Sequence, residues 1–133
     1  MPHKGSCLCG ETTVEVASTH EAQIVCHCTD CKQTSGSAFS TNILAPKDGV
    51  KITGPVKKFD IKAKSGNTVT RVFCGTCGSA ISHLSAVFGD KQAIQTGNLP
   101  DFAKVPIDTE LFVKDRWTGL VAIADAAQVQ TMP

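Results

Sequence analysis

The 133-residue sequence has few aromatic residues, almost no net charge and no long apolar run. Six Phe, one Trp and no Tyr are too few for a platform on which nucleic-acid bases stack. Thirteen Lys and Arg against twelve Asp and Glu leave a net charge of +1, which disfavours nucleic acid as a main partner. An apolar fraction of 41% is typical of a globular chain, so intrinsic disorder is disfavoured as well.

Segments that would direct the chain to a membrane or to secretion are also lacking. Residues 1–7 do not contain the apolar core of a signal peptide. The longest uncharged stretch near the C-terminus, 117–124, is too short to cross a bilayer. We therefore expect a cytoplasmic protein, with the nucleus as an alternative, and no membrane partner. The length is that of one domain, so we expect residues 1–133 to form a single domain.

Short segments rich in β-branched residues, separated by turn signals, predict a mainly β protein. Turn signals such as Asp48-Gly49 and Gly54-Pro55 follow one another closely and leave no room for long helices. We expect short helices only, after Cys31 and in the tail over 119–130, where several alanines favour helix. The predicted strands, taken as antiparallel, are 12–17, 23–28, 38–44, 50–53, 57–62, 68–74, 80–84, 93–96 and 110–114.

Cysteine is the residue that the sequence has in excess, with seven copies in three groups. In a reducing compartment, clustered cysteines bind metal or do chemistry more often than they form disulfides. An odd number also fits a fully paired disulfide framework poorly. The groups are the N-terminal pair (Cys7, Cys9), the central trio (Cys26, Cys28, Cys31) and the C-terminal pair (Cys74, Cys77).

Each group has the spacing of zinc ligands. In a C-x-x-C motif such as Cys74 to Cys77, a tight turn brings both sulfurs to about 2.3 Å from one ion. In an extended chain, residues two apart face the same side, so Cys26 and Cys28 face one way and His27 the other. The two members of the N-terminal pair share a side for the same reason. All three groups are therefore candidates for holding zinc.

The number of cysteines suggests two zinc sites of different kinds. A structural zinc takes four protein ligands, whereas a catalytic zinc takes three and keeps one position open. One division joins Cys28 and Cys31 to the C-terminal pair, although forty-two residues then separate the two halves. The other joins the N-terminal and C-terminal pairs and leaves the central trio, whose members are local. We favour the second, but spacing alone does not decide between them.

The sequence resembles the glutathione-dependent formaldehyde-activating enzymes, also called the S-(hydroxymethyl)glutathione synthase or centromere protein V family. The matching stretches are 5–10, 26–31 with 36–39, and 73–79, with looser matches at 97–99 and 111–114. The resemblance implies a mainly β, Mss4-like fold with zinc-binding knuckles. It also implies that Cys7, Cys9, Cys74 and Cys77 hold a structural zinc and that Cys26, Cys28 and Cys31 hold a catalytic one. The match weakens after Gly97, which leaves the thiol substrate open.

The activity that the resemblance implies is addition of a thiol, such as glutathione, to formaldehyde or another small carbonyl. The reverse cleavage would make the protein a carbon–sulfur lyase. Three thiolates around Zn²⁺ leave a formal charge of −1, which weakens the metal as a Lewis acid and suits binding of a substrate thiolate. Two other functions remain open: a non-catalytic zinc module that binds a partner, and a redox or metal-handling protein.

Other polar residues are weaker candidates. Residues 33–37 form either a group of hydroxyls and backbone N–H donors for substrate, or a polar loop or short helix start capped by Ser or Thr. We expect His27 to have a supporting or surface role, His83 to lie hydrogen-bonded in the core, and His3 and His20 to be exposed. Four basic residues could pair with the carboxylates of glutathione, although exposed bases are usually solvated: Lys32, Arg71, Lys114 and Arg116.

Overall fold

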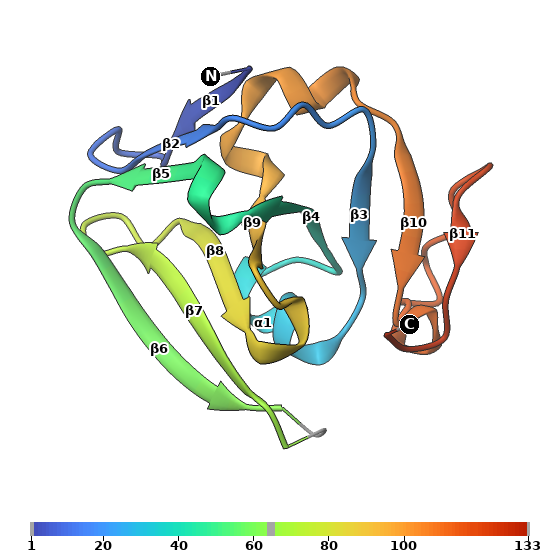
Figure 1. Cartoon of the computed structure of the whole chain (residues 1–133). Helices are drawn as coiled ribbons and strands as arrows, with labels where there is room; N and C mark the ends of the chain where they lie inside the picture. The colour runs from blue at the N-terminus through green and yellow to red at the C-terminus, as the bar shows by residue number, and fades with distance from the viewer. Residues whose placement is uncertain (1, 64–65, 133) are drawn as a thin grey trace.

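Strands make up most of the regular structure in the computed structural model, which describes residues 2–63 and 66–132. The mainly β fold predicted from the sequence is therefore confirmed. Figure 1 shows the strands curving around the molecule, with the single helix of the described residues, α1, near its centre. The strands are β1 (His3–Ser6), β2 (Thr13–Val16), β3 (Gln23–Cys26), β4 (Ser40–Pro46), β5 (Val50–Thr53), β6 (Val56–Lys62), β7 (Thr68–Cys74), β8 (Ala80–Ser85), β9 (Lys91–Gln95), β10 (Ile107–Leu111) and β11 (Ala127–Gln128).

The strands form two sheets. The smaller sheet has the order β1-β2-β5, and the larger has the order β11-β10-β3-β4-β9-β8-β7-β6. Neighbouring strands are antiparallel except where β10 pairs with β3 and with β11, which are both parallel to it. The sequence-based expectation of purely antiparallel pairing was therefore wrong at this edge, and the larger sheet is mixed.

A shared core holds the two sheets together. In β2, Val14 and Val16 are buried while the residues between and before them are not, the alternation expected of a strand with one buried face. Ile43 of β4 and Ile81 of β8 join them from the larger sheet. Burying each such side chain contributes about 1.5–3 kcal/mol. Cys7 and Cys74 lie in the same cluster, so the hydrophobic core reaches directly to two of the candidate ligands.

The helix α1 (Thr29–Ser35) starts earlier than predicted, because a cysteine caps it. The sulfur of Cys28 accepts a hydrogen bond from the backbone N–H of Cys31, and Cys28 itself stays extended. The helix ends at Gly36, which takes a left-handed conformation at φ 66° and donates its N–H to the carbonyl of Lys32. Glycine adopts that conformation without steric cost. The other turns are η1 (Lys47–Gly49), η2 (Ala86–Phe88), η3 (Thr96–Asn98), η4 (Pro100–Lys104) and η5 (Val113–Asp115).

The tail does not form the helix expected over 119–130. It forms turns and the short strand β11, and Asp125 takes a positive φ of 66° that breaks any helical run. The backbone N–H of Val129 instead donates to the carbonyl of Glu110, and that of Ile123 donates to the Glu110 carboxylate. Hydrogen bonds to β10 thus replace those that a helix would make within itself. In the described residues, no helix is long and apolar enough to span a membrane.

Candidate metal centres and active site

The N-terminal and C-terminal pairs come together in one group, which we call the cysteine quartet (Cys7, Cys9, Cys74, Cys77). Its four sulfurs all lie within 4.8 Å of one another. The Cys7 and Cys9 sulfurs are 3.6 Å apart, and those of Cys9 and Cys74 are 3.8 Å apart. Two ligands at about 2.3 Å from one tetrahedral ion are separated by about 3.8 Å. The quartet therefore fits a four-coordinate metal ion.

Backbone turns hold the quartet in this geometry. In the C-terminal pair, Gly78 donates its N–H to the carbonyl of Cys74, at a φ of 81° that favours glycine. The N–H of Thr76 points to the Cys74 sulfur at 3.4 Å. The hydroxyl of Ser79 lies 3.2 Å from the Cys77 sulfur and lowers the pKa of that thiol to about 5. These donors favour thiolates, the form in which cysteine binds metal.

The central trio forms the second group, with its three sulfurs within 4.8 Å of one another. Cys26 is the last residue of β3, Cys28 caps α1, and Cys31 lies in its first turn. Cys26 and Cys31 are buried, while Cys28 is half-buried. Hydrogen bonds from the Cys26 and Cys28 thiols lower the pKa of Cys31, whereas the hydrogen bonds with Cys28 and Cys31 raise the pKa of Cys26, so the trio by itself favours a single thiolate, at Cys31. The strand-to-helix junction thus gathers three ligands within six residues.

Within the described part of the chain, no fourth ligand completes the central trio. Among the residues that the structure describes, no other His, Cys, Asp or Glu offers a ligand atom within the same range. His83, which could have closed the site, is instead a buried side chain whose Nδ1 lies 3.2 Å from the amide nitrogen of Gln95. The expectation of a hydrogen-bonded core histidine is confirmed there. The trio therefore fits a metal ion with an open coordination position.

His27 lies between two members of the trio but points away from them. Its ring is 2% exposed, and Nε2 donates to the Glu110 carboxylate at 2.7 Å. The ring packs edge-on against Phe39, with the two centroids 5.7 Å apart. The surface position that the sequence left open for His27 is therefore wrong, and its supporting role stays a prediction. His3 is also buried, 2.5 Å from the Asp101 carboxylate, where the sequence had suggested exposure.

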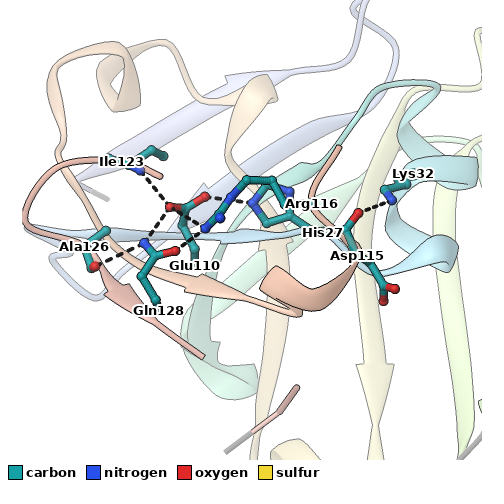
Figure 2. Close-up of polar contacts among 8 residues, drawn as sticks. All are labelled: His27, Lys32, Glu110, Asp115, Arg116, Ile123, Ala126 and Gln128. Atoms are coloured by element: carbon teal, nitrogen blue, oxygen red, sulfur yellow. Dashed lines mark hydrogen bonds and ion pairs between the residues drawn. The ribbon is translucent and has the colours of Figure 1, made fainter. Parts of the chain in front are cut away.

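Glu110 is a buried residue of this region that the sequence did not reveal. Figure 2 shows its carboxylate among donors from three segments. Besides His27, it accepts from Gln128 Nε2 at 2.7 Å, from the Ile123 N–H at 2.8 Å and from Arg116 at 3.4 Å. Burial alone would raise the pKa of this carboxyl, but the hydrogen bonds outweigh it and lower the pKa to about 2. One charged carboxylate therefore joins the trio's loop to the tail.

The tail also closes the apolar surroundings of the trio. Cys26, Cys31 and Leu111 form a small buried cluster, and Val129 of the tail packs against it. Phe112 packs there as well, with a positive φ of 55° at the point where the chain leaves β10. The trio is thus partly shielded from water by residues that follow β10. A single acidic or apolar residue in a strand gives no spacing signal, which is why these contacts escaped the sequence-based reading.

Comparison with known proteins identifies the family. A family model described as glutathione-dependent formaldehyde-activating enzyme matches residues 2–115. The chain belongs to this family. The crystal structure of a Rhodobacter sphaeroides protein has a similar fold, with a TM-score of 0.59 at 18% identity over 78% of this chain and 98% of that one. At this identity the likeness supports the fold alone. The resemblance drawn from the cysteine spacing is thus confirmed.

Three of the four basic residues considered for substrate binding are engaged within the protein. Lys32 donates to the carbonyl of Asp115 at 2.5 Å, and its nitrogen lies 5.9 Å from the centroid of the Trp117 ring. Lys114 pairs with the Asp115 carboxylate at 3.5 Å. Arg116 contacts Glu110 as described above and also donates to Gln128. Arg71, the fourth, forms no ion pair among the described residues.

Residues 33–37 also differ from the expectation. They form the last turn of α1 and its cap rather than a loop or a helix start. The hydroxyls of Thr34 and Ser35 donate to the carbonyl of Cys31, at 3.3 and 2.7 Å. The N–H of Ser37 donates to the Ser35 hydroxyl at 3.3 Å. The segment in this family member therefore fixes Cys31 in place and presents few free donors.

Proposed function

We propose that this protein is a zinc-dependent carbon–sulfur lyase that adds a thiol such as glutathione to formaldehyde or another small carbonyl, or catalyses the reverse cleavage. Membership of the glutathione-dependent formaldehyde-activating family supports the substrate classes. The observation that carries the proposal is the central trio, three close sulfurs without a fourth ligand among the described residues. A structural site would be closed by a fourth ligand.

The two cysteine groups would have different roles, one structural and one catalytic. In the proposal the cysteine quartet holds a structural zinc and the central trio holds a catalytic one. When bound at the trio, zinc supplies a coordination position at which a substrate thiol loses its proton. Three cysteine ligands leave formal negative charge at the site, which disfavours activation of water and hence hydrolysis.

The reaction needs neither oxidant nor reductant. The sulfur forms a bond to the carbonyl carbon, the carbon–oxygen π bond breaks, and the thiol proton ends on the oxygen to give a hydroxymethyl thioether. The protein's contribution is to hold the thiol in place for a small carbonyl, since bringing the two partners together is the entropic difficulty of an addition. The apolar cluster formed by Leu111, Phe112 and Val129 shields the trio and limits competition from water.

The test combines metal analysis with product detection. Purified protein should contain about two zinc ions per chain, and ¹³C-formaldehyde with glutathione should give the hydroxymethyl adduct faster with enzyme than without, as followed by NMR. Cys28→Ser should keep the fold, contain about one zinc fewer and lose the acceleration. A protein with two zinc ions and no acceleration for any thiol would favour the non-catalytic zinc module instead.

A further inference from the structure

A row of buried polar side chains leads across the larger sheet to the central trio. Gln95 of β9 and Asn42 of β4 face each other in the pairing of the two strands. Ser40 lies two residues before Asn42, on the same face of β4, and is the neighbour of Cys26 on β3. Gln95, Asn42 and Ser40 are only 8%, 6% and 3% exposed. The row therefore runs through the protein interior and ends beside a candidate metal ligand.

Hydrogen bonds join these three side chains into a chain with a definite direction. The Nε2 of Gln95 donates to Asn42 Oδ1 at 2.7 Å, and Asn42 Nδ2 donates to the hydroxyl oxygen of Ser40 at 2.9 Å. Because this oxygen accepts from Asn42, the hydroxyl can donate its own hydrogen onward. The Ser40 hydroxyl is hydrogen-bonded to Cys31 and lowers the pKa of that thiol. Each group thus donates toward the trio, and we call Gln95, Asn42 and Ser40 the relay.

His83 holds the far end of the relay in this orientation. The Nε2 of Gln95 also lies 3.2 Å from His83 Nδ1. An amide nitrogen carries two hydrogens and accepts none, so Nδ1 is the acceptor in this contact. Burial lowers the pKa of His83 to about 4, so the ring is neutral near pH 7 and its Nδ1 can accept. The amide of Gln95 cannot turn over without placing its oxygen against the lone pair of that nitrogen.

A donor to Cys31 affects the charge that a metal ion in the trio must carry. Three thiolates around Zn²⁺ have a formal charge of −1, and a substrate thiolate as fourth ligand would bring it to −2. A hydrogen bond to an anionic sulfur withdraws part of this charge and is stronger than one between neutral groups. Groups that hydrogen-bond to metal ligands typically change metal affinity or activity about 10–100-fold. The position of Ser40 therefore suits a site that must accept one more thiolate.

We propose that the relay positions the Ser40 hydroxyl as a donor to the Cys31 sulfur and so allows the metal ion of the trio to take a substrate thiolate as its fourth ligand. Its members act through Cys31 and are positioning residues. This inference rests on the proposed function, because it takes the trio to hold zinc and the substrate to bind through sulfur. It goes further by making thiol binding depend on Gln95, which lies two side chains away from Cys31.

The first test measures zinc affinity, which requires no turnover. Zinc is removed from the protein by titration with a chromophoric chelator, and comparison with Cys28→Ser identifies the ion that belongs to the trio. Ser40→Ala should bind this ion about tenfold more weakly. Ser40→Thr keeps a hydroxyl and should stay within about threefold of the wild type. Unchanged affinity in Ser40→Ala, or an equal loss in both variants, would overturn the relay.

A spectrum of the sulfur ligands distinguishes a lost hydrogen bond from a loosened fold. Co²⁺ in place of zinc gives sulfur-to-metal charge-transfer absorption, whose energy falls when a sulfur becomes more electron-rich. Subtracting the spectrum of Cys28→Ser leaves the absorption of the trio. Ser40→Ala should shift this absorption to longer wavelength, because the Cys31 sulfur loses its donor. Absorption at the wild-type position would contradict the role assigned to Ser40.

A substitution at the far end tests whether the relay acts as a unit. Gln95→Met should weaken zinc binding at the trio by about threefold to tenfold and shift the Co²⁺ absorption in the same direction as Ser40→Ala. Gln92→Met is the matched control, because Gln92 is 9% exposed on the same strand but faces the other side of the sheet. Its zinc affinity should stay within about twofold of the wild type. Should Gln95→Met fail to fold, Asn42→Ala breaks the same chain and decides. Equal effects at positions 95 and 92 would overturn the relay.

Thiol binding separates this inference from the proposed function. In the Co²⁺ protein without any carbonyl, Ser40→Ala should bind glutathione and 2-mercaptoethanol about threefold to tenfold more weakly than the wild type does. Both thiols should be affected alike, because the relay acts on the sulfur that they share. Thiol binding by the wild type without adduct formation from formaldehyde would refute the proposed function and leave the relay standing. Equal thiol affinity in wild type and Ser40→Ala would overturn the relay even in an active enzyme.

Discussion

His83 is a buried base whose protonation opposes folding. Its folded-state pKa of about 4 lies below the ordinary value of 6.5, so the unfolded chain binds more protons between these two values. The free energy of unfolding therefore falls as the pH drops below about 6.5, and the loss is complete below about pH 4. Each unit of pKa difference corresponds to about 1.4 kcal/mol.

A substitution at His83 tests whether this residue lowers the free energy of unfolding in acid. From pH 7 to pH 5, His83 should cost the wild-type protein about 2 kcal/mol of unfolding free energy. His83→Gln keeps a hydrogen-bonding side chain but cannot titrate, so its loss over the same interval should be smaller by about that amount. Urea unfolding at both pH values measures the difference, and protonation of the cysteines, which is common to both proteins, cancels. Parallel pH profiles would contradict the expectation.

At the scale of single residues, the sequence predicts only those contacts that the spacing of residues along the chain indicates. The seven cysteines have fixed separations, and their grouping followed from ligand geometry together with the family resemblance. Glu110 has no such pattern, because its partners in the tail are 6 to 18 positions away. Arg71 has none either, because its neighbours lie on the adjacent strands. A buried carboxylate or an unpaired arginine becomes visible only when the strands are paired.

Among the secondary structure elements, β10 depends most on a single side chain. Its Glu110 receives hydrogen bonds from the loop of the central trio and from the tail (Figure 2). Replacing the carboxylate by an amide would direct N–H groups at donors and leave Arg116 without its buried partner. Removing one partner of a buried ion pair typically costs 3–5 kcal/mol. The whole edge formed by β3, β10 and β11 should therefore loosen together.

Glu110→Gln tests this dependence. We expect its free energy of unfolding to fall by about 3 kcal/mol, and the amide protons of Ile123 and Val129 to exchange faster with solvent. Urea unfolding and hydrogen exchange by NMR measure the two effects. Glu21→Gln is the control, because Glu21 is exposed and should change stability by less than about 0.5 kcal/mol. A similarly small effect in Glu110→Gln would rule out the role assigned to it.

Prediction of the elements succeeded where local pattern and tertiary context agree. The segments 50–53 and 68–74 were predicted with the bounds that β5 and β7 have, since β-branched residues alternate there between clear turn signals. β1 was missed because His3–Ser6 contains no apolar side chain. The predicted helix of the tail failed because hydrogen bonds to Glu110 outweigh the helix preference of alanine.

At the scale of the whole molecule, the cysteine quartet connects the two sheets. Cys7 follows β1 of the smaller sheet, while Cys74 ends β7 of the larger one. Both are buried in the common core. In small zinc domains, metal binding contributes about 10 kcal/mol or more to folding. Loss of the ion from the quartet should therefore affect both sheets, whereas loss from the trio should affect one edge.

A pair of matched substitutions tests this difference. Cys77→Ser should unfold the protein or lower its melting temperature severely, because three ligands would no longer hold the ion that we propose for the quartet. Cys28→Ser should stay folded with about one zinc fewer, because its group is local and lies at the helix start. Circular dichroism and zinc content measured on the same samples give the comparison. Equal collapse of both variants would refute the division into structural and catalytic sites.

The quartet also sets an order of events for the newly made chain. Cys9 and Cys74 are 65 positions apart, whereas the central trio is complete within six residues. As the ribosome releases the chain, the trio and the N-terminal pair are both available long before the C-terminal pair emerges. An ion captured early by a mixed set of these five cysteines must be given up again before the sheets can join. If the two groups hold zinc as proposed, correct assembly depends on the ion exchanging quickly until Cys77 has emerged, and a cell that supplies the metal too early would slow the maturation of this protein.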